Sequence, residues 1–368
     1  MRSIGGGKMK YEYWYANLKL SCKRKQELRK VLKSAEELYY IEESALKNYM
    51  HNDSEQEIIL KSIKEWNLEE EYKRLEQKGV QFVSILDETY PRRLRDISSP
   101  PYALYVKGCL PDEKIPTAAI VGARECSPYG ETMAREFAKV LADAGIQIVS
   151  GMARGVDSAG QRGALEAGGT SFGILGCGVD ICYPREGIGL YMELQENGGV
   201  LSEFPIGTPP LPQNFPARNR IISGLSDMVL LIEAKEKSGS LITVDMALEQ
   251  GKDVYALPGP INSRLSRGCN EMIKQGAGVL LSPKEFLQEI GLSQKLKNKK
   301  TEQKKIVLET EEKLVYSCLG FSPKNLEGIM RETKLSVVKL LDILMSLELK
   351  GFVKELSKNY YVAIVEEV

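Results

Sequence analysis

The feature that most constrains the fold is a regular alternation of short apolar runs with longer amphipathic stretches between residues 117 and 281. Strands that alternate with helices of about 10–15 residues predict a parallel, doubly wound α/β sheet. The run at 228–233 is almost continuously hydrophobic, which is typical of a strand buried on both faces. The expected strands are 118–121, 147–150, 170–175, 199–203, 228–233, 253–257 and 278–281, and the clearest helices are 128–144, 157–167 and 240–250.

The sequence on either side of this alternation divides the chain further. Residues 1–78 repeat apolar positions at helical spacing with few glycines, so we expect a helical module. Residues 79–290 form the α/β domain, and its extended pieces at 81–86 and 100–106 are expected to lead into the sheet. Residues 291–306 form a basic linker. Residues 307–368 have the outline of a winged helix; its helices are expected at 309–319, 322–331 and 336–349, before a hairpin.

Composition excludes several classes of protein. No apolar run approaches the roughly 20 residues that span a bilayer, and the first residues lack the apolar core of a signal peptide. Seven cysteines without a CxxC pair, together with a single histidine, make a zinc site unexpected and fit a reducing cytoplasm. Because 50 cationic residues balance 50 acidic ones, any site for nucleic acid must be local.

Basic residues are concentrated where the predicted strands end. In open α/β sheets, ligands bind outside the carboxyl ends of the strands. Residues 115–290 hold 15 Lys and Arg against 20 Asp and Glu, so this region is acidic overall. Eight of the 15 cations nevertheless fall in the loops that follow strands: Arg124, Arg154, Arg218, Arg220, Lys235, Lys237, Arg264 and Arg267. Glycines beside them allow close approach of a backbone and N–H groups at helix N-termini, an arrangement that suits phosphates.

The run from Phe215 to Arg220 carries the most functional information. It combines an aromatic ring that can stack on a base with arginines that can bind phosphates, as single-stranded nucleic acid requires. Structural explanations remain open: Phe215 as an anchor in the core, and Arg218 or Arg220 as partners of Asp227 or Glu233.

Other motifs in the sheet region are weaker. Gly176-Cys-Gly178 matches only the first half of a dinucleotide-binding GxGxxG motif, and no P-loop sequence occurs. Ser238-Gly239-Ser240 is equally well explained as a helix N-cap. The aromatic residues Tyr11, Tyr13, Trp14 and Tyr15 are expected to pack within the helical module.

The C-terminal domain is a poor reader of duplex sequence. From Lys324 to Val368 seven cations balance seven acidic residues. Its third helix offers little besides Lys339 to a major groove, whereas reading bases requires Arg, Asn or Gln at base edges. A protein contact is at least as well supported for this domain.

The ordered motifs of the chain resemble those of the DNA processing protein A family, also called DprA or Smf. The resemblance covers nearly the whole chain and is most specific in the central domain. The motifs are Gly122-Ala-Arg124, Ser150 to Asp157, Leu175 to Asp180 with Tyr183-Pro184, Ser202 to Pro205, Phe215 to Ser226, Glu233-Ala234, Ser238 to Thr243, Pro258-Gly259, and Gly268-Cys-Asn270 to Gly276-Ala277.

The resemblance implies an extended Rossmann-like fold with a SAM-like helical N-terminal module, and a cytoplasmic protein that binds single-stranded DNA without sequence preference. It also implies a homodimer without a cofactor or metal that loads RecA onto DNA in natural transformation, with single-strand-binding protein as a further candidate partner. Residues 269–277 are a candidate dimer region. Some relatives carry a basic residue just before the Phe-Pro pair, where this chain has Pro212, Gln213 and Asn214.

The strand ends and the motifs together define one set of candidate DNA-binding residues. They are Gly122, Arg124, Gly151, Arg154, Gly176, Gly178, Phe215, Arg218, Asn219, Arg220, Lys237, Ser238, Gly239, Ser240 and Thr243. We expect a change of Arg124 or Arg218 to Glu to abolish binding without unfolding the protein.

The alternative is an enzyme, because the fold also resembles that of nucleotide phosphoribohydrolases. Glu203, Glu233 and Arg220 could then serve in catalysis. Against this alternative, those enzymes carry a Pro-Gly-Gly-x-Gly-Thr-x-x-Glu signature, which this chain breaks at Pro258-Gly259-Pro260.

Overall fold

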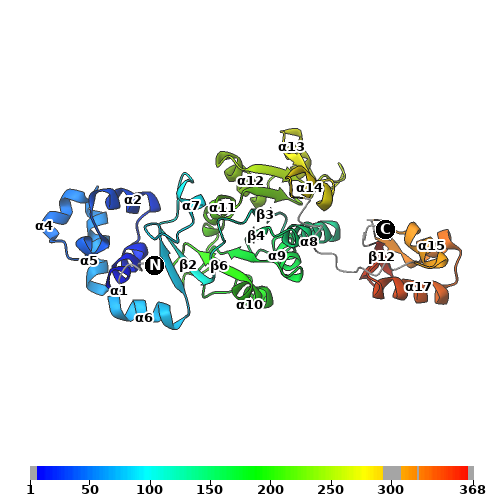
Figure 1. Ribbon diagram of the computed structural model, residues 1–368, viewed down its shortest axis with the longest axis horizontal. Helices are drawn as coiled ribbons and strands as arrows, with labels where there is room; N and C mark the ends of the chain where they lie inside the picture. Colours follow the sequence, from blue (N-terminus) through cyan, green and yellow to red (C-terminus); the bar gives the residue numbers. More distant parts are fainter. Residues whose placement is uncertain (1–5, 293–307, 321–322, 364–368) are drawn as a thin grey trace. The chain divides into compact units, whose positions relative to one another are not determined.

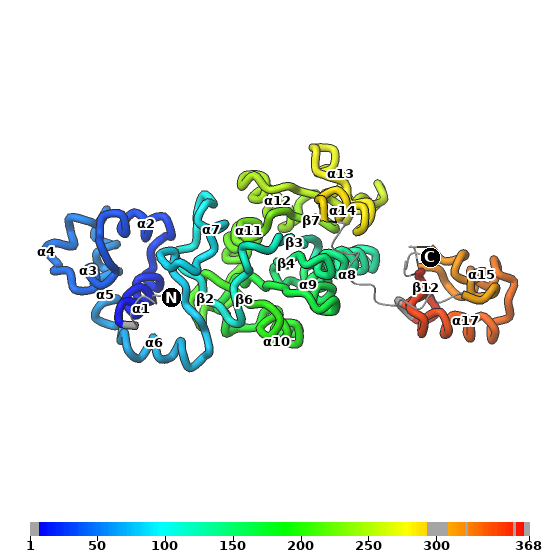
Figure 2. The backbone as a smooth tube through the Cα atoms, viewed as in Figure 1, coloured from blue at the N-terminus to red at the C-terminus, as the bar shows by residue number. Residues whose placement is uncertain are grey.

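The computed structural model describes residues 6–292, 308–320 and 323–363. Within them the chain forms two compact units, the larger comprising residues 6–126 and 133–292 and the smaller including the C-terminal domain. Most of the predicted basic linker, 291–306, lies outside the described residues. Figures 1 and 2 follow the chain from the blue N-terminal helices through the green sheet domain to the red C-terminal domain.

The N-terminal helices begin where the sequence supplies side-chain caps. Ser21, Ser34, Asn52 and Asn67 each accept a hydrogen bond from the backbone N–H three residues later, which satisfies a donor that the first turn leaves free. The expected helical region is confirmed. Its helices are α1 (Gly6–Asn17), α2 (Cys22–Val31), α3 (Ala35–Tyr39), α4 (Glu43–Leu46), η1 (Lys47–Tyr49), α5 (Asp53–Glu65) and α6 (Leu68–Gln77).

The central sheet has nine strands and is mostly parallel, as predicted. Its order is β1-β2-β6-β5-β4-β3-β7-β8-β9, and of these strands β2 alone is reversed, pairing antiparallel with both β1 and β6. The approach segments at 81–86 and 100–106 thus form an antiparallel edge of the sheet. The strands are β1 (Gln81–Ser84), β2 (Ala103–Gly108), β3 (Thr117–Val121), β4 (Gln147–Ser150), β5 (Ser171–Ile174), β6 (Gly198–Ser202), β7 (Met228–Leu231), β8 (Asp253–Ala256) and β9 (Gly278–Val279).

Helices cover both faces of this sheet, with α11 and α12 on one face and α9 and α10 on the other (Figure 1). Consecutive strand residues face opposite sides, so Val200 belongs to one buried cluster and Leu201 to another. The helices are α7 (Arg92–Arg95), α8 (Pro128–Asp143), α9 (Val156–Glu166), η2 (Arg185–Gly187), α10 (Ile188–Glu196), α11 (Asn214–Leu225), α12 (Gly239–Glu249), α13 (Arg267–Lys274) and α14 (Pro283–Glu289).

The N-terminal helices share a core with the antiparallel edge of the sheet. Tyr13, Trp14 and Tyr15 are buried, which confirms that they serve packing. The ring of Tyr13 lies edge-on to Phe82 on β1 and to Tyr105 on β2. Aromatic pairs in this geometry stabilise a core beyond the area that they bury. The helical region and the sheet therefore belong to one compact unit.

The C-terminal domain is a winged helix. Its elements are α15 (Thr310–Cys318), β10 (Lys324–Asn325), α16 (Leu326–Thr333), α17 (Val337–Leu349), β11 (Val353–Ser357) and β12 (Tyr360–Ala363). The three helices and the hairpin match the sequence expectation. The two-residue strand β10, which pairs with β12, carries no pattern by which it could be predicted. In the described parts of both units, no helix has the length and apolar character that a membrane span requires.

Candidate nucleic-acid interface

The order of the strands creates a switch point between β3 and β7. From β3 the chain proceeds to β4, β5 and β6 on one side, and from β7 to β8 and β9 on the other. In open sheets the loops on either side of such a point diverge, and the crevice between them is the usual ligand position. Arg124 lies in the loop after β3, and Lys235 and Lys237 lie in the loop after β7; all three are exposed.

Helix α11 brings the aromatic ring to this edge. Its first residue, Asn214, is buried and donates from Nδ2 to the carbonyl oxygen of Gly176 at 3.0 Å. This bond places Phe215 directly over Gly176, in the loop after β5. A Cβ at position 176 would lie 2.9 Å from Phe215 Cδ1, so the ring can occupy this place only because residue 176 is glycine.

Phe215 forms one stack with two other side chains. The Tyr183 ring lies 5.4 Å from the Phe215 ring at an interplanar angle of 37°. The guanidinium of Arg124 lies over the Phe215 ring. Its Cζ is 5.6 Å from the ring centroid, which is within cation–π range. We call Arg124, Tyr183 and Phe215 the Phe215 shelf. Tyr183 remains 39% exposed, so the shelf offers an accessible aromatic face beside a cation.

Tyr183 is absent from the candidates chosen from the sequence. The sequence did contain a signal for Tyr183, because this residue lies in the loop after β5 and belongs to a family motif. Position alone did not show that this loop folds back against Phe215.

Arg218 lies beneath the surface. Its side chain is 4% exposed and donates to the carbonyl oxygen of Ile174. A Cβ at position 151 would collide with Arg218 Nη1 and with Asp157 Oδ2, so Gly151 makes room for both groups. The expectation that Arg218→Glu leaves the fold intact is therefore corrected: a second carboxylate buried beside Asp157 would be strongly destabilising.

Burial shifts the ionisation of this pair. The apolar surroundings raise the pKa of Asp157 to about 6, although the nearby Arg218 and backbone N–H groups of Ala153 and Gly151 lower it. Burial also lowers the pKa of Arg218 to about 10, which keeps the guanidinium charged at neutral pH. Asp157 accepts from the N–H of Gly151 at 3.1 Å and so ties the loop after β4 to α9, while Arg218 ties α11 to Ile174 at the end of β5.

Arg220 is held by structural contacts on another side of α11. It forms an ion pair with Glu203 and donates from Nε to the carbonyl oxygen of Ser99 at 2.8 Å. Its ion-pair partner is thus neither Asp227 nor Glu233. Glu203 and Arg220, two residues that the enzyme alternative would use in catalysis, engage each other, and Glu233 is buried.

The remaining polar candidates surround the start of α12. Ser238 caps this helix, since its Oγ accepts from the N–H of Ser240, so the N-cap interpretation is confirmed. Asn219 donates from Nδ2 to the carbonyl oxygen of Gly239 at 3.4 Å, while Ser240 and Thr243 are buried.

The other candidates are placed mainly by packing or ion pairing. Arg154 is exposed and forms an ion pair with Glu186. A Cβ at Gly122 would strike Val156, and one at Gly178 would strike the carbonyl oxygen of Pro205, so these two glycines serve close packing.

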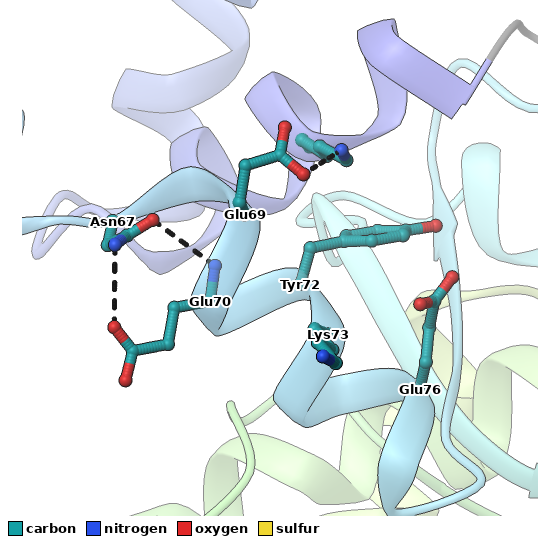
Figure 3. A pocket seen from close by; sticks show the side chains of 7 residues that line it. Asn67, Glu69, Glu70, Tyr72, Lys73 and Glu76 are labelled. Carbon is teal, nitrogen blue, oxygen red and sulfur yellow. Dashed lines mark hydrogen bonds and ion pairs between the residues drawn. The ribbon is translucent and has the colours of Figure 1, made fainter.

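Two concave regions can be described on the surface of the described residues. A cavity of about 220 Å³ lies next to the crevice and is lined by Lys235, Glu236, Lys237, Arg264 and Arg267. A wider depression of about 660 Å³ lies on the N-terminal helices (Figure 3) and is lined by Lys10, Asn67, Glu69, Glu70, Tyr72, Lys73 and Glu76. Glu69 there pairs with Lys10. The acidic lining of this depression does not suit DNA.

In the described part of the chain, no cluster of three or more His, Cys, Asp or Glu is arranged to hold a metal ion.

Comparison with known families decides the affiliation. Residues 81–291 match the model of the DNA recombination-mediator protein A family. The chain belongs to this family. Residues 299–358 also match the DprA winged helix domain, in agreement with the fold of the C-terminal unit.

Individual relatives support the same assignment. The chain is 45% identical to protein Smf of Escherichia coli over 217 residues, 59% of this chain and 58% of that protein. It is 42% identical to DNA processing protein DprA of Streptococcus pneumoniae over 206 residues, 56% of this chain and 73% of the relative. The match thus spans little more than half the length of the Escherichia coli protein.

Two solved structures of the family are similar in fold. The X-ray structure of DprA from Streptococcus pneumoniae has a TM-score of 0.67 and 32% identity, covering 76% of this chain and 97% of that one. The second is DprA from Helicobacter pylori, described for its single-stranded DNA binding mode. It has a TM-score of 0.52 and 31% identity, and the match covers 58% of this chain and 97% of the Helicobacter pylori chain.

Proposed function

We propose that this chain binds single-stranded DNA without sequence preference on the Phe215 shelf. The observation that carries the proposal is the stack of Arg124, Phe215 and Tyr183 at the carboxyl edge of the sheet. An exposed ring accepts any base, because every base has a π-face, and an adjacent guanidinium neutralises a phosphate. The relative from Helicobacter pylori, which binds single-stranded DNA, has the same fold.

We further propose that the protein is a recombination mediator in the cytoplasm. Family membership supports a role in loading RecA onto single-stranded DNA during natural transformation. A homodimer that contacts through residues 269–277, and an encounter with single-strand-binding protein, are parts of the same proposal. The Arg220–Glu203 ion pair supports a binding protein over a phosphoribohydrolase, since it occupies two of the side chains that catalysis would need.

The test is binding of a fluorescent oligothymidylate of about 20 nucleotides, followed by anisotropy at two salt concentrations. Arg124→Glu removes the cation from the shelf and adds a repulsive charge, so the affinity should fall at least about tenfold, or 1.4 kcal/mol. Arg124 is exposed, so the melting temperature should not change.

Arg162→Glu is the matched control, because Arg162 is an exposed arginine on α9, away from the loops that carry the shelf. It should bind like the original protein. Tight binding by Arg124→Glu would refute the site, and failure of the unaltered protein to bind would refute the function. Displacement of single-strand-binding protein by RecA, measured through the DNA-dependent ATPase of RecA, tests the mediator role separately.

A further inference from the structure

The cavity beside the crevice is lined entirely by charged residues. Lys235, Lys237, Arg264 and Arg267 face one acid, Glu236, around a space of about 220 Å³. Glu236 pairs with Arg267 at 3.3 Å. In the described parts of the molecule the other three cations form no ion pair. We call these five residues the basic cleft. Like charges held this close repel one another, and a bound polyanion relieves that repulsion.

Backbone contacts hold the two walls of the basic cleft together. The N–H of Ala234, in the loop after β7, donates to the carbonyl oxygen of Leu265 at 2.7 Å. In return, the carbonyl oxygen of Ala234 accepts from the N–H of Gly268 at 2.8 Å. Within the wall after β8, Asn270 makes a reciprocal pair of hydrogen bonds with the N–H and carbonyl of Gly259, at 3.2 and 2.9 Å. The cations are thus exposed side chains on a fixed frame, which lowers the cost of ordering them around a ligand.

The basic cleft lies on the far side of the switch point from the Phe215 shelf. Arg124 follows β3, Lys235 and Lys237 follow β7, and Arg264 follows β8, and these three strands are neighbours in the sheet. Neighbouring strands are about 4.8 Å apart, so β3 and β8, the strands that precede Arg124 and Arg264, lie roughly 10 Å apart along the edge. This distance is about three nucleotides at the ~3.4 Å rise of a stacked strand.

We propose that the basic cleft is a second phosphate subsite for the single strand that stacks on the Phe215 shelf. This inference rests on the proposed function and extends its binding site from the loop after β5 to the loop after β8. The cleft is lined by no aromatic residue, so it binds the sugar-phosphate backbone and leaves the bases free. The occupant is DNA because the cleft continues the edge that carries the shelf.

The test compares two oligothymidylates, one of about two nucleotides, too short to span the separation, and one of about fifteen. Lys235→Gln combined with Arg264→Gln removes one unpaired cation from each wall of the cleft. The short oligonucleotide should bind as before, because it occupies the shelf alone. The long one should bind about tenfold more weakly. Its salt slope should fall by about 1.4, because each phosphate that a cation neutralises on a single strand adds ~0.7 to the slope.

Lys139→Gln is the control, since Lys139 is an exposed lysine on α8 outside the cleft. Equal losses at both lengths, or none at either, would overturn the subsite. If the unaltered protein binds neither oligonucleotide, the proposed function fails instead. If Arg124→Glu weakens both lengths while the cleft variant weakens neither, only the subsite is refuted.

A second measurement needs no variant. The long oligonucleotide should protect Lys235 and Lys237 of the full chain from acetylation, as read by mass spectrometry, and the short one should not. Lys139 on α8 should react equally in all samples. Protection by polyglutamate but not by the long oligonucleotide would assign the cleft to an acidic protein and overturn the proposal.

Discussion

At the scale of single residues, two arginines of the same motif set have opposite environments. Arg124 is exposed and rests on the face of Phe215, whereas Arg218 is 4% exposed beneath the loop after β4. Arg124 lies in a loop, whereas Arg218 lies one helical turn after Asn214, on the side of α11 that faces the sheet. The first suits contact with DNA and the second supports the loop that frames the site.

The buried carboxyl of Asp157 should make stability depend on pH. Its pKa in the folded protein is raised to about 6 from 3.8, so the folded state binds this proton more tightly than the unfolded chain does. The resulting stabilisation is complete below pH 3.8 and is lost as the pH rises through about 6. Relative to Asp157→Asn, the unaltered protein should therefore gain stability between about pH 7.5 and about pH 5, as measured by melting temperature.

Asp245→Asn, which removes an exposed carboxyl on α12, controls for the loss of one acidic group. The difference in melting temperature between the unaltered protein and Asp157→Asn is the quantity to follow. If it stays constant with pH, or grows toward high pH, the raised pKa of Asp157 is contradicted.

The sequence predicted which residues gather at the carboxyl edge of the sheet more reliably than whether each side chain is exposed or bound to a partner. Phe215 and Arg124 were identified as candidates, and they meet. Arg220 was identified by the same pattern, yet its side chain is bound to Glu203, because residues two apart on a helix point in different directions. Tyr183 was not chosen as a candidate, since its contact with Phe215 joins segments that only the fold brings together.

At the scale of elements, α11 builds the site because its first turn sits at the carboxyl edge of the sheet. Asn214 fixes that turn to Gly176, and the absence of a side chain at Gly176 lets Phe215 lie flat against the loop after β5. The strands and helices of this region match the sequence expectation, because buried parallel strands and amphipathic helices carry strong periodic signals. The contact between helix and loop carries no such signal.

Gly176→Ala should displace the ring of Phe215. The new methyl group would lie 2.9 Å from Cδ1, and the side chain, rather than the backbone, is expected to move. Poorer stacking of a base on the displaced ring should weaken oligothymidylate binding by about 1 kcal/mol, or roughly fivefold, while the melting temperature of the protein changes little. Anisotropy and thermal denaturation measure the two effects.

Gly189→Ala, on α10, is the matched control, because a Cβ there meets nothing within 4 Å. Equal binding by the two variants would show that the position of the Phe215 ring does not matter for DNA.

At the scale of the whole molecule, the edge that carries the proposed DNA site lies in the larger unit. The Phe215 shelf and the basic cleft fall within residues 124–267. The winged helix instead exposes apolar side chains on α17, with Val338 at 73%, Met345 at 65% and Leu349 at 83%. Such a helix lacks the polar groups that read base edges in a major groove.

Removal of residues 296–368 should therefore leave the affinity for single-stranded DNA unchanged. The shortened protein is compared with the full chain by anisotropy, with single-stranded and duplex oligonucleotides of one sequence. A large loss of single-strand affinity would place part of the site in the winged helix. Strong duplex binding that disappears on removal would identify the winged helix as a duplex reader.

The sequence by itself determined the class of the fold, the order of its elements and the residues that carry the family motifs. These properties are local, since periodicity, caps and turn residues act over a few positions along the chain. The tertiary structure alone decided which motif residues face solvent. The placement of Arg124 on Phe215, of Arg218 beneath Gly151 and of Arg220 against Glu203 depends on contacts between segments distant in the chain, and burial there determines which charges remain available to a phosphate.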